Sequence, residues 1–362
     1  MSRPQLRIVI LGLSITSSWG NGHATTYRGL VRELSARGHT VLFLERDVPW
    51  YASTRDLPHP PHGRTVVYRD VAELKRRFAG DVADADLVIV GSYVPEGIEV
   101  GEWVVRTARG LSAFYDIDTP VTLASLARGE NDYLTAVLIP RYDLYLSFTG
   151  GPTLDRLERE YGSPMARPLY CAVDQELYRP APEPPQWDLG YMGTYSDDRQ
   201  PMLARLLIEP ARAWPTGRFV VAGPQYPRTV EWPANVNRID HLPPAQHSGF
   251  YNAQSFTLNL TRADMVAAGF SPSVRLFEAA ACGTPIISDD WEGLDTLFEP
   301  GREILIARST AEVLELIRDL SASDRLALGA RARARVLAEH TAAHRAAELE
   351  GYALELLSGL PA

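Results

Sequence analysis

The sequence has few of the residues that cross-link small secreted proteins or hold structural metals. Only two of its 362 residues are cysteines, Cys171 and Cys282. Two cysteines cannot build a disulfide framework, and neither has a partner at the spacing of a zinc site, so we expect no bound metal. The short apolar run near the start, RIVILGL, favours a buried strand over a signal peptide, because no cleavage-site pattern follows it.

Positive charge and long apolar stretches are also scarce. Acidic residues outnumber basic residues by 45 to 36, which gives a formal net charge of −9. This balance argues against the broad basic surface that general nucleic-acid binding requires, so any anion site must be local. No stretch approaches the roughly 18 apolar residues of a membrane-spanning helix. We therefore expect no membrane span and, by default, a cytoplasmic protein.

The sequence does contain a regular alternation of apolar runs and helical segments. Residues 7–13 are continuously apolar, as in a strand buried on both faces, and residues 24–38 have an apolar helical face and end at Gly38. A second strand at 39–45 completes a β-α-β unit, which implies a parallel sheet with a right-handed crossover. Further strands are expected at 86–92, 111–117, 142–148 and 167–173, with a helix at 153–162.

A proline-rich segment, 174–187, separates this series from a second one. We expect strands at 188–193, 218–223, 237–242, 255–260 and 285–289, and mostly helix after Thr310. The length suits two domains. The expected division is an N-terminal domain 1–173, a linker 174–187, a C-terminal domain 188–335 and a helical segment 336–362. Both domains are expected to be doubly wound α/β sheets, which bind ligands at the carboxyl ends of their strands.

The stretch SPSVRLFEAAACGTPIIS, residues 271–288, places two charges in an apolar helix. Ser271 followed by Pro272 predicts the helix start, and Gly283 its end. Arg275 then lies in the first turn, with Glu278 one turn later. Two interpretations remain open. The helix start and Arg275 bind a diphosphate while Glu278 accepts hydrogen bonds from a ribose, or the two side chains form an ion pair worth about 0.2–0.5 kcal/mol.

This stretch resembles the C-terminal signature of the group 1 glycosyltransferases, and its R-x-F-E-A version resembles the branch of CgeB-like spore maturation proteins. Three further segments are similar to family motifs in the family's order: GNGHATTYRGLVRELSARGHTV, CAVDQELYRP, and EPGREILIA with AEHTAAHRAAEL. The resemblance implies a GT-B fold, with two Rossmann-like, doubly wound parallel-sheet domains that face each other across a cleft. The first domain is then the acceptor side, the second binds the nucleotide sugar, and the last segment crosses back to the first.

The resemblance implies a glycosyltransferase that moves a sugar from a nucleoside-diphosphate sugar to an unidentified acceptor. It implies no cofactor and no metal dependence. Two alternatives remain open, a nucleotide-sugar epimerase of the same fold and a non-catalytic nucleotide-sugar-binding pseudoenzyme. Phe270 stands where retaining members of the family carry a second glutamate, which leaves the stereochemical outcome open.

The resemblance also assigns donor-site residues in the second domain. Glu278 is implied to bind the donor ribose. Thr194 follows Gly193 at the position of a family arginine, so neutralisation of the diphosphate is expected to fall to Arg199, Arg275 and backbone N–H groups. The expected donor-binding residues are Glu278, Arg275, Arg199, Gly193, Thr194, Ser273 and Leu242.

The first domain offers candidates at two strand ends. Asp116 and Asp118 follow a buried strand, and either of them, Asp118 preferred, could deprotonate an acceptor hydroxyl or instead cap the next helix. His23 opens a helix and could contact the donor phosphate or the acceptor, or serve as a cap. The loop after the first strand is expected to line the cleft through Gly20, Asn21 and Gly22, with the hydroxyls of Thr16, Ser17 and Ser18. A dinucleotide site that uses Glu45 is disfavoured, since Thr25 replaces the third glycine.

Overall fold

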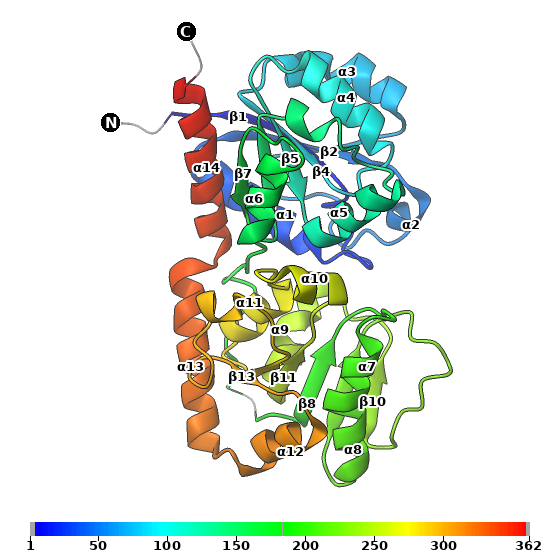
Figure 1. The fold of residues 1–362 in the computed structure, drawn as a ribbon, viewed down its shortest axis with the longest axis vertical. Coiled ribbons are helices and arrows are strands. Elements are labelled where there is room, and N and C mark those ends of the chain that lie inside the picture. Colours follow the sequence, from blue (N-terminus) through cyan, green and yellow to red (C-terminus); the bar gives the residue numbers. More distant parts are fainter. Residues whose placement is uncertain (1–3, 183, 360–362) are drawn as a thin grey trace. The chain divides into compact units, whose positions relative to one another are not determined.

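The computed structural model describes residues 4–182 and 184–359, which form two compact units (Figure 1). The first unit comprises the chain up to Cys171 together with the residues from Ala342 onward, and the second runs from Ala172 to Thr341. The segment 172–187, most of which was expected to be a linker, thus counts with the second unit. Residues 1–3, 183 and 360–362, which fall in the expected first domain, linker and C-terminal segment, lie outside the described residues.

The first unit is built on a parallel sheet of seven strands within the described residues. The strands are β1 (Arg7–Gly12), β2 (Thr40–Arg46), β3 (Arg64–Tyr68), β4 (Leu87–Gly91), β5 (Leu111–Asp116), β6 (Leu144–Ser147) and β7 (Ala166–Pro168), in the order β3-β2-β1-β4-β5-β6-β7. The expected pairing of the first two strands is parallel, with Arg7 opposite Thr40. The edge strand β3 was not predicted. The strands β1 and β4 are almost wholly buried because helices cover the sheet.

Helices of the first unit follow most of its strands. They are α1 (His23–Ala36), α2 (Pro49–Ala52), α3 (Val71–Ala83), α4 (Gly97–Thr107), α5 (Thr119–Arg128), α6 (Pro152–Arg159) and α14 (Ala342–Gly359), with a 3₁₀ turn at Ile139–Arg141. The last helix, red in Figure 1, packs on α1 and β5. Gly29 permits this approach, since a Cβ there would lie 3.0 Å from that of Ala342. Arg37 adds a hydrogen bond to the buried Glu350 carboxylate.

The second unit contains a parallel sheet of six strands within the described residues. The strands are β8 (Trp187–Met192), β9 (Phe219–Ala222), β10 (Val236–Ile239), β11 (Gln254–Asn259), β12 (Ile286–Ser288) and β13 (Leu305–Ile306), in the order β10-β9-β8-β11-β12-β13. The helices are α7 (Gln200–Leu203), a π-turn (Ala204–Ile208), α8 (Glu209–Ala213), α9 (Pro244–Asn252), α10 (Ala263–Ala268), α11 (Val274–Ala281), a 3₁₀ turn (Leu294–Thr296), α12 (Thr310–Asp319) and α13 (Ala322–Glu339). No helix in the described part of the chain is long and apolar enough to cross a membrane.

Both sheets reverse their strand order at one place. In the first sheet β1 is paired with β2 on one side and β4 on the other, and in the second sheet β8 lies between β9 and β11. The loops that leave two such strands diverge to opposite faces of the sheet, so the carboxyl ends of the strands border a crevice where ligands bind. The expected class, two doubly wound parallel-sheet α/β units, is confirmed. Each unit therefore offers its own position for a site.

The helix with the two charges starts later than predicted. It begins at Val274 with Ser273 at its N-cap position, rather than at Pro272 with Ser271 as the cap. Ser271 is buried, and the Ser273 hydroxyl donates to Asn259 Oδ1 instead of capping the helix. The predicted end is right, because Gly283 has a φ of 72° and its N–H and that of Thr284 bond back to Ala280 and Ala279.

We predict that α11 and α13 depend on the absence of a side chain at Gly329. A Cβ there would lie 2.0 Å from the Gly283 carbonyl oxygen. Gly329→Ala should therefore lower the free energy of unfolding by about 1–3 kcal/mol, as overpacking usually does. The control is Gly351→Ala in α14, where a Cβ would meet nothing within 4 Å. It should leave stability unchanged or raise it by up to about 1 kcal/mol. Denaturant unfolding of both variants measures the contrast, and equal effects would contradict it.

Candidate active site

Arg275 occupies the reversal point of the second sheet. Its side chain is only 7% exposed. The Nε atom donates to the carbonyl oxygen of Met192 at 2.6 Å, and Nη1 donates to Asn259 Oδ1 at 2.9 Å. The guanidinium also lies over the Tyr191 ring, 4.9 Å from its centroid. One side chain thus joins the carboxyl ends of β8 and β11.

This buried cation has no carboxylate partner within the described chain. In particular, Arg275 and Glu278 do not form the ion pair that was one of the two open interpretations, because their side chains have different partners. The nearby Asp289 carboxylate accepts two hydrogen bonds from Thr261, and its pKa is raised by burial despite the Arg275 charge. The Nη2 group of Arg275 has no hydrogen-bond partner among the described residues. Burying an unpaired charge is costly, so this arrangement favours an anion beside it.

A second guanidinium follows β8 in the loop that leads to α7. Arg199 Nη2 donates to the Thr194 carbonyl oxygen at 2.8 Å, while its Nε atom is buried and unpartnered. Burial raises the pKa of Tyr226, and the charges of Arg238, Arg199 and Arg275 partly oppose this shift. All three cations therefore lie near one tyrosine. Arg199 and Arg275, both without an ion pair in the described structure, make this strand end electropositive.

The glycine that follows β8 packs too closely for any larger residue. A Cβ at Gly193 would lie 2.5 Å from the Tyr191 hydroxyl. Its N–H donates to Ala222 and its carbonyl oxygen accepts from the Tyr226 hydroxyl at 3.1 Å. The ends of β8 and β11 thus bring together five of the expected donor-binding residues, Gly193, Thr194, Arg199, Ser273 and Arg275. The family resemblance implies the diphosphate at this place.

Asn259 is the residue of this cluster that sequence reasoning missed. It is fully buried at the end of β11, accepts from both Arg275 and Ser273 and donates to the Ser288 hydroxyl at 2.9 Å. Its amide therefore fixes the first turn of α11 on the sheet. The available signal was a polar residue at the end of an otherwise apolar strand, SFTLNL.

Glu278 is buried among aromatic hydroxyl groups rather than paired with a cation. The Tyr251 hydroxyl donates to Glu278 Oε2 at 3.0 Å. The pKa of Tyr178 is raised by burial and then by the Glu278 charge, so the Tyr178 hydroxyl also lies close to this carboxylate. Tyr178 contacts His247 Nδ1 at 3.2 Å, and His247 Nε2 contacts the Leu242 carbonyl oxygen at 3.0 Å. Leu242 is thus connected to Glu278 through Tyr178 and His247, neither of which the sequence singled out.

Phe270, which replaces a family glutamate, has a strained backbone. Its φ of 48° lies in the left-handed region, which is unusual for a bulky residue. Its N–H donates to the Glu292 carbonyl oxygen at 2.6 Å. The ring covers Gly293, where a Cβ would lie 2.3 Å from Phe270 Cδ1. The apolar ring therefore occupies a precisely packed position just before α11.

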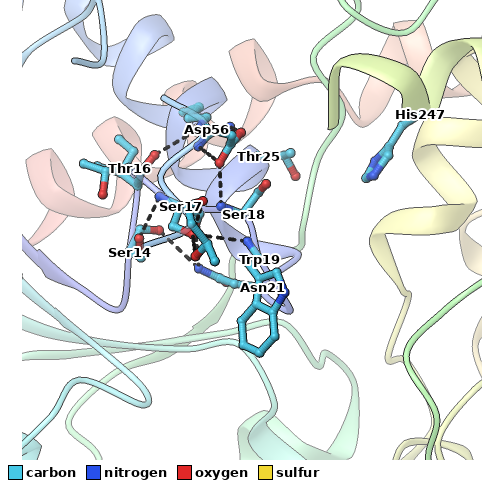
Figure 2. A network of polar contacts seen from close by, with 12 residues as sticks. Ser14, Thr16, Ser17, Ser18, Trp19, Asn21, Thr25, Asp56 and His247 are labelled. Carbon is cyan, nitrogen blue, oxygen red and sulfur yellow. Dashed lines mark hydrogen bonds and ion pairs between the residues drawn. The ribbon is translucent and has the colours of Figure 1, made fainter. Parts of the chain in front are cut away.

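In the first unit, the loop after β1 is held by buried polar contacts (Figure 2). Glu45 accepts from the N–H groups of Ile15 and Thr16 and from the Thr16 hydroxyl, at 2.6–3.0 Å. Glu45, Thr16 and Ser17 are fully buried. The prediction that the hydroxyls of Thr16 and Ser17 line an open site is therefore wrong. The dinucleotide alternative also fails on this point, since the Glu45 carboxylate is already used.

The middle of the same loop divides into buried and exposed positions. Asn21 is buried and its Nδ2 bonds weakly to the carbonyl oxygens of Ser14 and Ser17, so its side chain supports the loop rather than lining a site. Gly20 and Gly22 are exposed. Asp56 anchors the loop by accepting the Ser18 N–H at 2.8 Å, as Figure 2 shows.

His23 is the first residue of α1, as expected, but it carries no charge. Burial lowers the pKa of its imidazole to about 3. The ring lies 5.5 Å from that of Phe148, and its Nδ1 atom is buried without a partner. The side chain as a whole is partly exposed, so the structure places Nδ1, and not the entire ring, away from water. His23 can act only as a neutral hydrogen-bonding group near neutral pH.

The two aspartates at the end of β5 and just after it have different surroundings. Asp116 is fully buried and accepts from Tyr145, Thr122 and the Asp118 N–H at 2.5, 2.9 and 3.2 Å. Burial raises its pKa to about 6. Its carboxylate therefore anchors the turn, and the expectation that it faces an acceptor is wrong. The structure supports the preference for the other aspartate only in that Asp118 is less buried.

Asp118 stands at the N-cap position of α5, but its side chain does not cap the helix. Its Oδ2 atom accepts a hydrogen bond from the Tyr93 hydroxyl at 2.9 Å. Tyr93 follows β4, so this contact links the loops after β4 and β5. The capping alternative is therefore wrong, and Asp118 stays a candidate for contact with an acceptor.

Comparison with known proteins defines the class of fold. The two units together form the GT-B fold of glycosyltransferases. Sucrose-phosphate synthase from Thermosynechococcus elongatus is 16% identical and matches with a TM-score of 0.72 over 98% of this chain and 100% of that one. The Anabaena protein HepE in complex with UDP and glucose is 13% identical, with a TM-score of 0.69 and coverages of 98% and 100%. At these identities the likeness establishes the fold alone.

Two further comparisons complete this picture. An alpha-glucosyltransferase in complex with UDP is 13% identical, with a TM-score of 0.73 over 97% of this chain and 100% of that one. The family model described as "Glycosyl transferase-like" matches residues 199–351, a range that holds Arg199, Arg275 and Glu278. No curated protein sequence matches the chain.

We predict that acid stabilises the protein through Asp116. The folded carboxyl group has a pKa of about 6, above its ordinary value of 3.8, so the native state binds this proton more tightly. Its contribution is full below about pH 4 and is lost as the pH rises through about 6. Asp116→Asn removes this titration. The melting temperature of the wild type relative to the variant should rise as the pH falls from about 7 to about 4.

The matched control is Asp155→Asn, which changes an exposed aspartate of α6. Its melting temperature should follow that of the wild type over the same pH range. If the Asp116→Asn protein also followed the wild type, the buried carboxyl would not titrate between the two values.

Proposed function

We propose that the chain is a glycosyltransferase that transfers a sugar from a nucleoside-diphosphate sugar to an acceptor hydroxyl group. The observation that carries this proposal is the buried Arg275 guanidinium, which has no carboxylate partner in the described chain and lies where the second sheet reverses. A diphosphate supplies the missing negative charge, and its oxygens suit the free Nη2 group. The "Glycosyl transferase-like" match and the UDP bound by proteins of similar fold support the proposal.

The second unit would hold the donor along α11. Arg199 and Arg275 would contact the diphosphate, with N–H groups near Gly193 and Thr194 and the Ser273 hydroxyl beside them. Glu278 would bind the ribose through its carboxylate, which the Tyr251 hydroxyl holds in place. Leu242, joined to this cluster through His247, would lie near the base.

The first unit would hold the acceptor. Asp118 would accept the proton of the attacking hydroxyl group or orient that group. Gly20 and Gly22 of the loop after β1 and the neutral His23 at the start of α1 would contribute further contacts. Because two guanidinium groups balance the diphosphate, we propose that the reaction needs no metal and no cofactor. We also propose, on the R-x-F-E-A segment alone, that the chain lies in the CgeB-like branch.

Glu278→Gln should weaken the binding of UDP at least about tenfold, since each hydrogen bond to a charged group contributes about 1.5–3 kcal/mol. Unfolding should change little, because Tyr251 can still donate to the amide oxygen. Titration calorimetry with UDP measures the affinity. Glu315→Gln, an exposed position of α12, is the control. Unchanged UDP affinity together with a lower melting temperature would make Glu278 a structural residue only.

Substitution of Arg199 or Arg275 should reduce the affinity for the phosphate groups more than the affinity for the nucleoside. Arg199→Gln and Arg275→Gln should weaken UDP by a larger factor than uridine, because the lost charge faces the diphosphate. The ratio of the two affinities separates this effect from any loss of packing around Arg275. An equal loss for both ligands would contradict the assignment.

Asp118→Asn should lower turnover by about 10²–10⁴-fold while leaving UDP affinity unchanged, as expected for a general base. Chelation of metals with EDTA should not change the rate. Incubation of the protein with a sugar nucleotide alone should give only slow hydrolysis. Conversion to a different sugar nucleotide would favour the epimerase, and the absence of both binding and turnover with every sugar nucleotide would contradict both enzymes.

A further inference from the structure

The first unit contains a pocket of about 410 Å³ beside the candidate base. Its walls come from α2, the turn between β4 and α4, and α5 with the loop that follows it. Its lining includes Trp50, Tyr93, Glu96, Asn131, Asp132 and Tyr133. This volume lies within the range of pockets that bind small molecules. The Tyr93 hydroxyl donates to Asp118, so the pocket adjoins the residue proposed to receive the acceptor proton.

The charged residues in the described lining of this pocket are all acidic. Three of its residues are acidic, Glu96, Glu130 and Asp132, and none of its described lining residues is basic. Glu96 lies 3.3 Å from Arg46 Nε and Glu130 lies 2.6 Å from Arg128 Nε, both outside the lining. Asp132 has no ion pair within the described chain. The pocket therefore attracts a cation, most directly through Asp132.

Aromatic rings form another part of the wall. Trp50 is 53% exposed, although it is a large apolar side chain. The rings of Tyr93 and Tyr133 lie 4.8 Å apart between centroids. Aromatic faces attract ammonium groups and also pack against the C–H face of a sugar ring. Negative charge and exposed rings thus favour the same kind of ligand.

Asn131 supplies an unused hydrogen-bond donor. Its Oδ1 atom accepts from the N–H groups of Tyr133 and Leu134, at 3.0 and 2.8 Å, which fixes the orientation of the amide. Its Nδ2 atom is buried and has no partner. Buried donors are almost always satisfied, so this N–H group calls for an acceptor atom such as a hydroxyl oxygen.

The backbone of the pocket is held in an unusual conformation. Tyr93 and Glu96 have φ values of 62° and 53°, in the left-handed region that non-glycine residues seldom adopt. Both residues line the pocket. Strain of this kind concentrates at ligand sites because the side chains must point in a required direction.

We propose that this pocket binds the acceptor and that the acceptor is a sugar ring with a protonated amino group. Asp132, with Glu96 and Glu130, faces the ammonium group, Trp50 packs on the ring, and Asn131 donates to a ring hydroxyl. That the bound sugar is the acceptor of the reaction rests on the proposed function, whereas the binding of an amino sugar in this pocket does not. A neutral sugar does not balance the negative charge of Asp132, and that charge repels an anion.

The test uses ligand-observed NMR titration of the full chain with glucosamine, glucose and N-acetylglucosamine in the absence of nucleotide. Glucosamine should bind at least tenfold more tightly than the two neutral sugars, and added salt should reduce the difference. Asp132→Asn combined with Glu130→Gln should lower glucosamine affinity at least tenfold. Trp50→Ala should weaken all three sugars. Asp155→Asn, an exposed aspartate outside the pocket, is the matched control and should change nothing.

Thermal unfolding of the same variants shows whether the first unit is folded, and UDP titration keeps the two proposals separate. Unchanged UDP affinity is expected, because the donor would lie in the second unit. Equal binding of glucosamine and glucose, no binding of glucosamine by the wild type, or insensitivity to the acidic double variant would each overturn the amino-sugar proposal. Failure of every nucleoside diphosphate to bind the wild type would instead count against the glycosyltransferase proposal and leave the sugar titrations valid.

Discussion

A single buried arginine determines how the second unit presents its strand ends. Arg275 bonds to the last carbonyl group of β8 and to the side chain that ends β11. These are the two strands between which the order of the sheet reverses, so the same contacts that hold the crevice place a cation in it. The Nε and Nη1 groups of Arg275 donate to uncharged oxygen atoms, so these hydrogen bonds do not balance the positive charge. A bound anion would balance this charge, which is why we propose an anion site here.

The first unit uses buried carboxylates to hold two of its loops. Glu45 fixes the loop after β1, and Asp116 fixes the turn after β5 through three hydrogen bonds. Because both carboxylates are buried and accept hydrogen bonds within the protein, they position their loops. We therefore look to neighbouring residues for the proposed chemistry. Asp118, half-buried and bonded to the Tyr93 hydroxyl, is such a neighbour. In both units, polar groups that hold the structure thus lie within a few residues of groups that we propose to be functional.

The sequence predicted the sheets well and the site only in part. Long apolar runs identify the central strands, whereas the edge strand β3, RTVVY, is partly exposed and lacks such a run. The start of α11 was predicted two residues too early, at Pro272. Proline is common both at the first position of a helix and in the extended segment before one, so the sequence does not separate the two. Sequence spacing placed Arg275 and Glu278 correctly on α11. It could not distinguish Asp116 from Asp118, since burial and the contact with Tyr145 depend on strands distant in the chain.

The central claim is that α11 binds a nucleoside diphosphate, and a crystal structure of the chain with UDP tests it most directly. The account predicts that phosphate oxygens lie within hydrogen-bond distance of Arg275 Nη2 and that the ribose hydroxyls meet the Glu278 carboxylate. Arg275 should keep its bonds to Met192 and Asn259, because they hold the site open before the ligand arrives. UDP bound elsewhere, or bound here with Arg275 and Glu278 making no contact to it, would contradict the account.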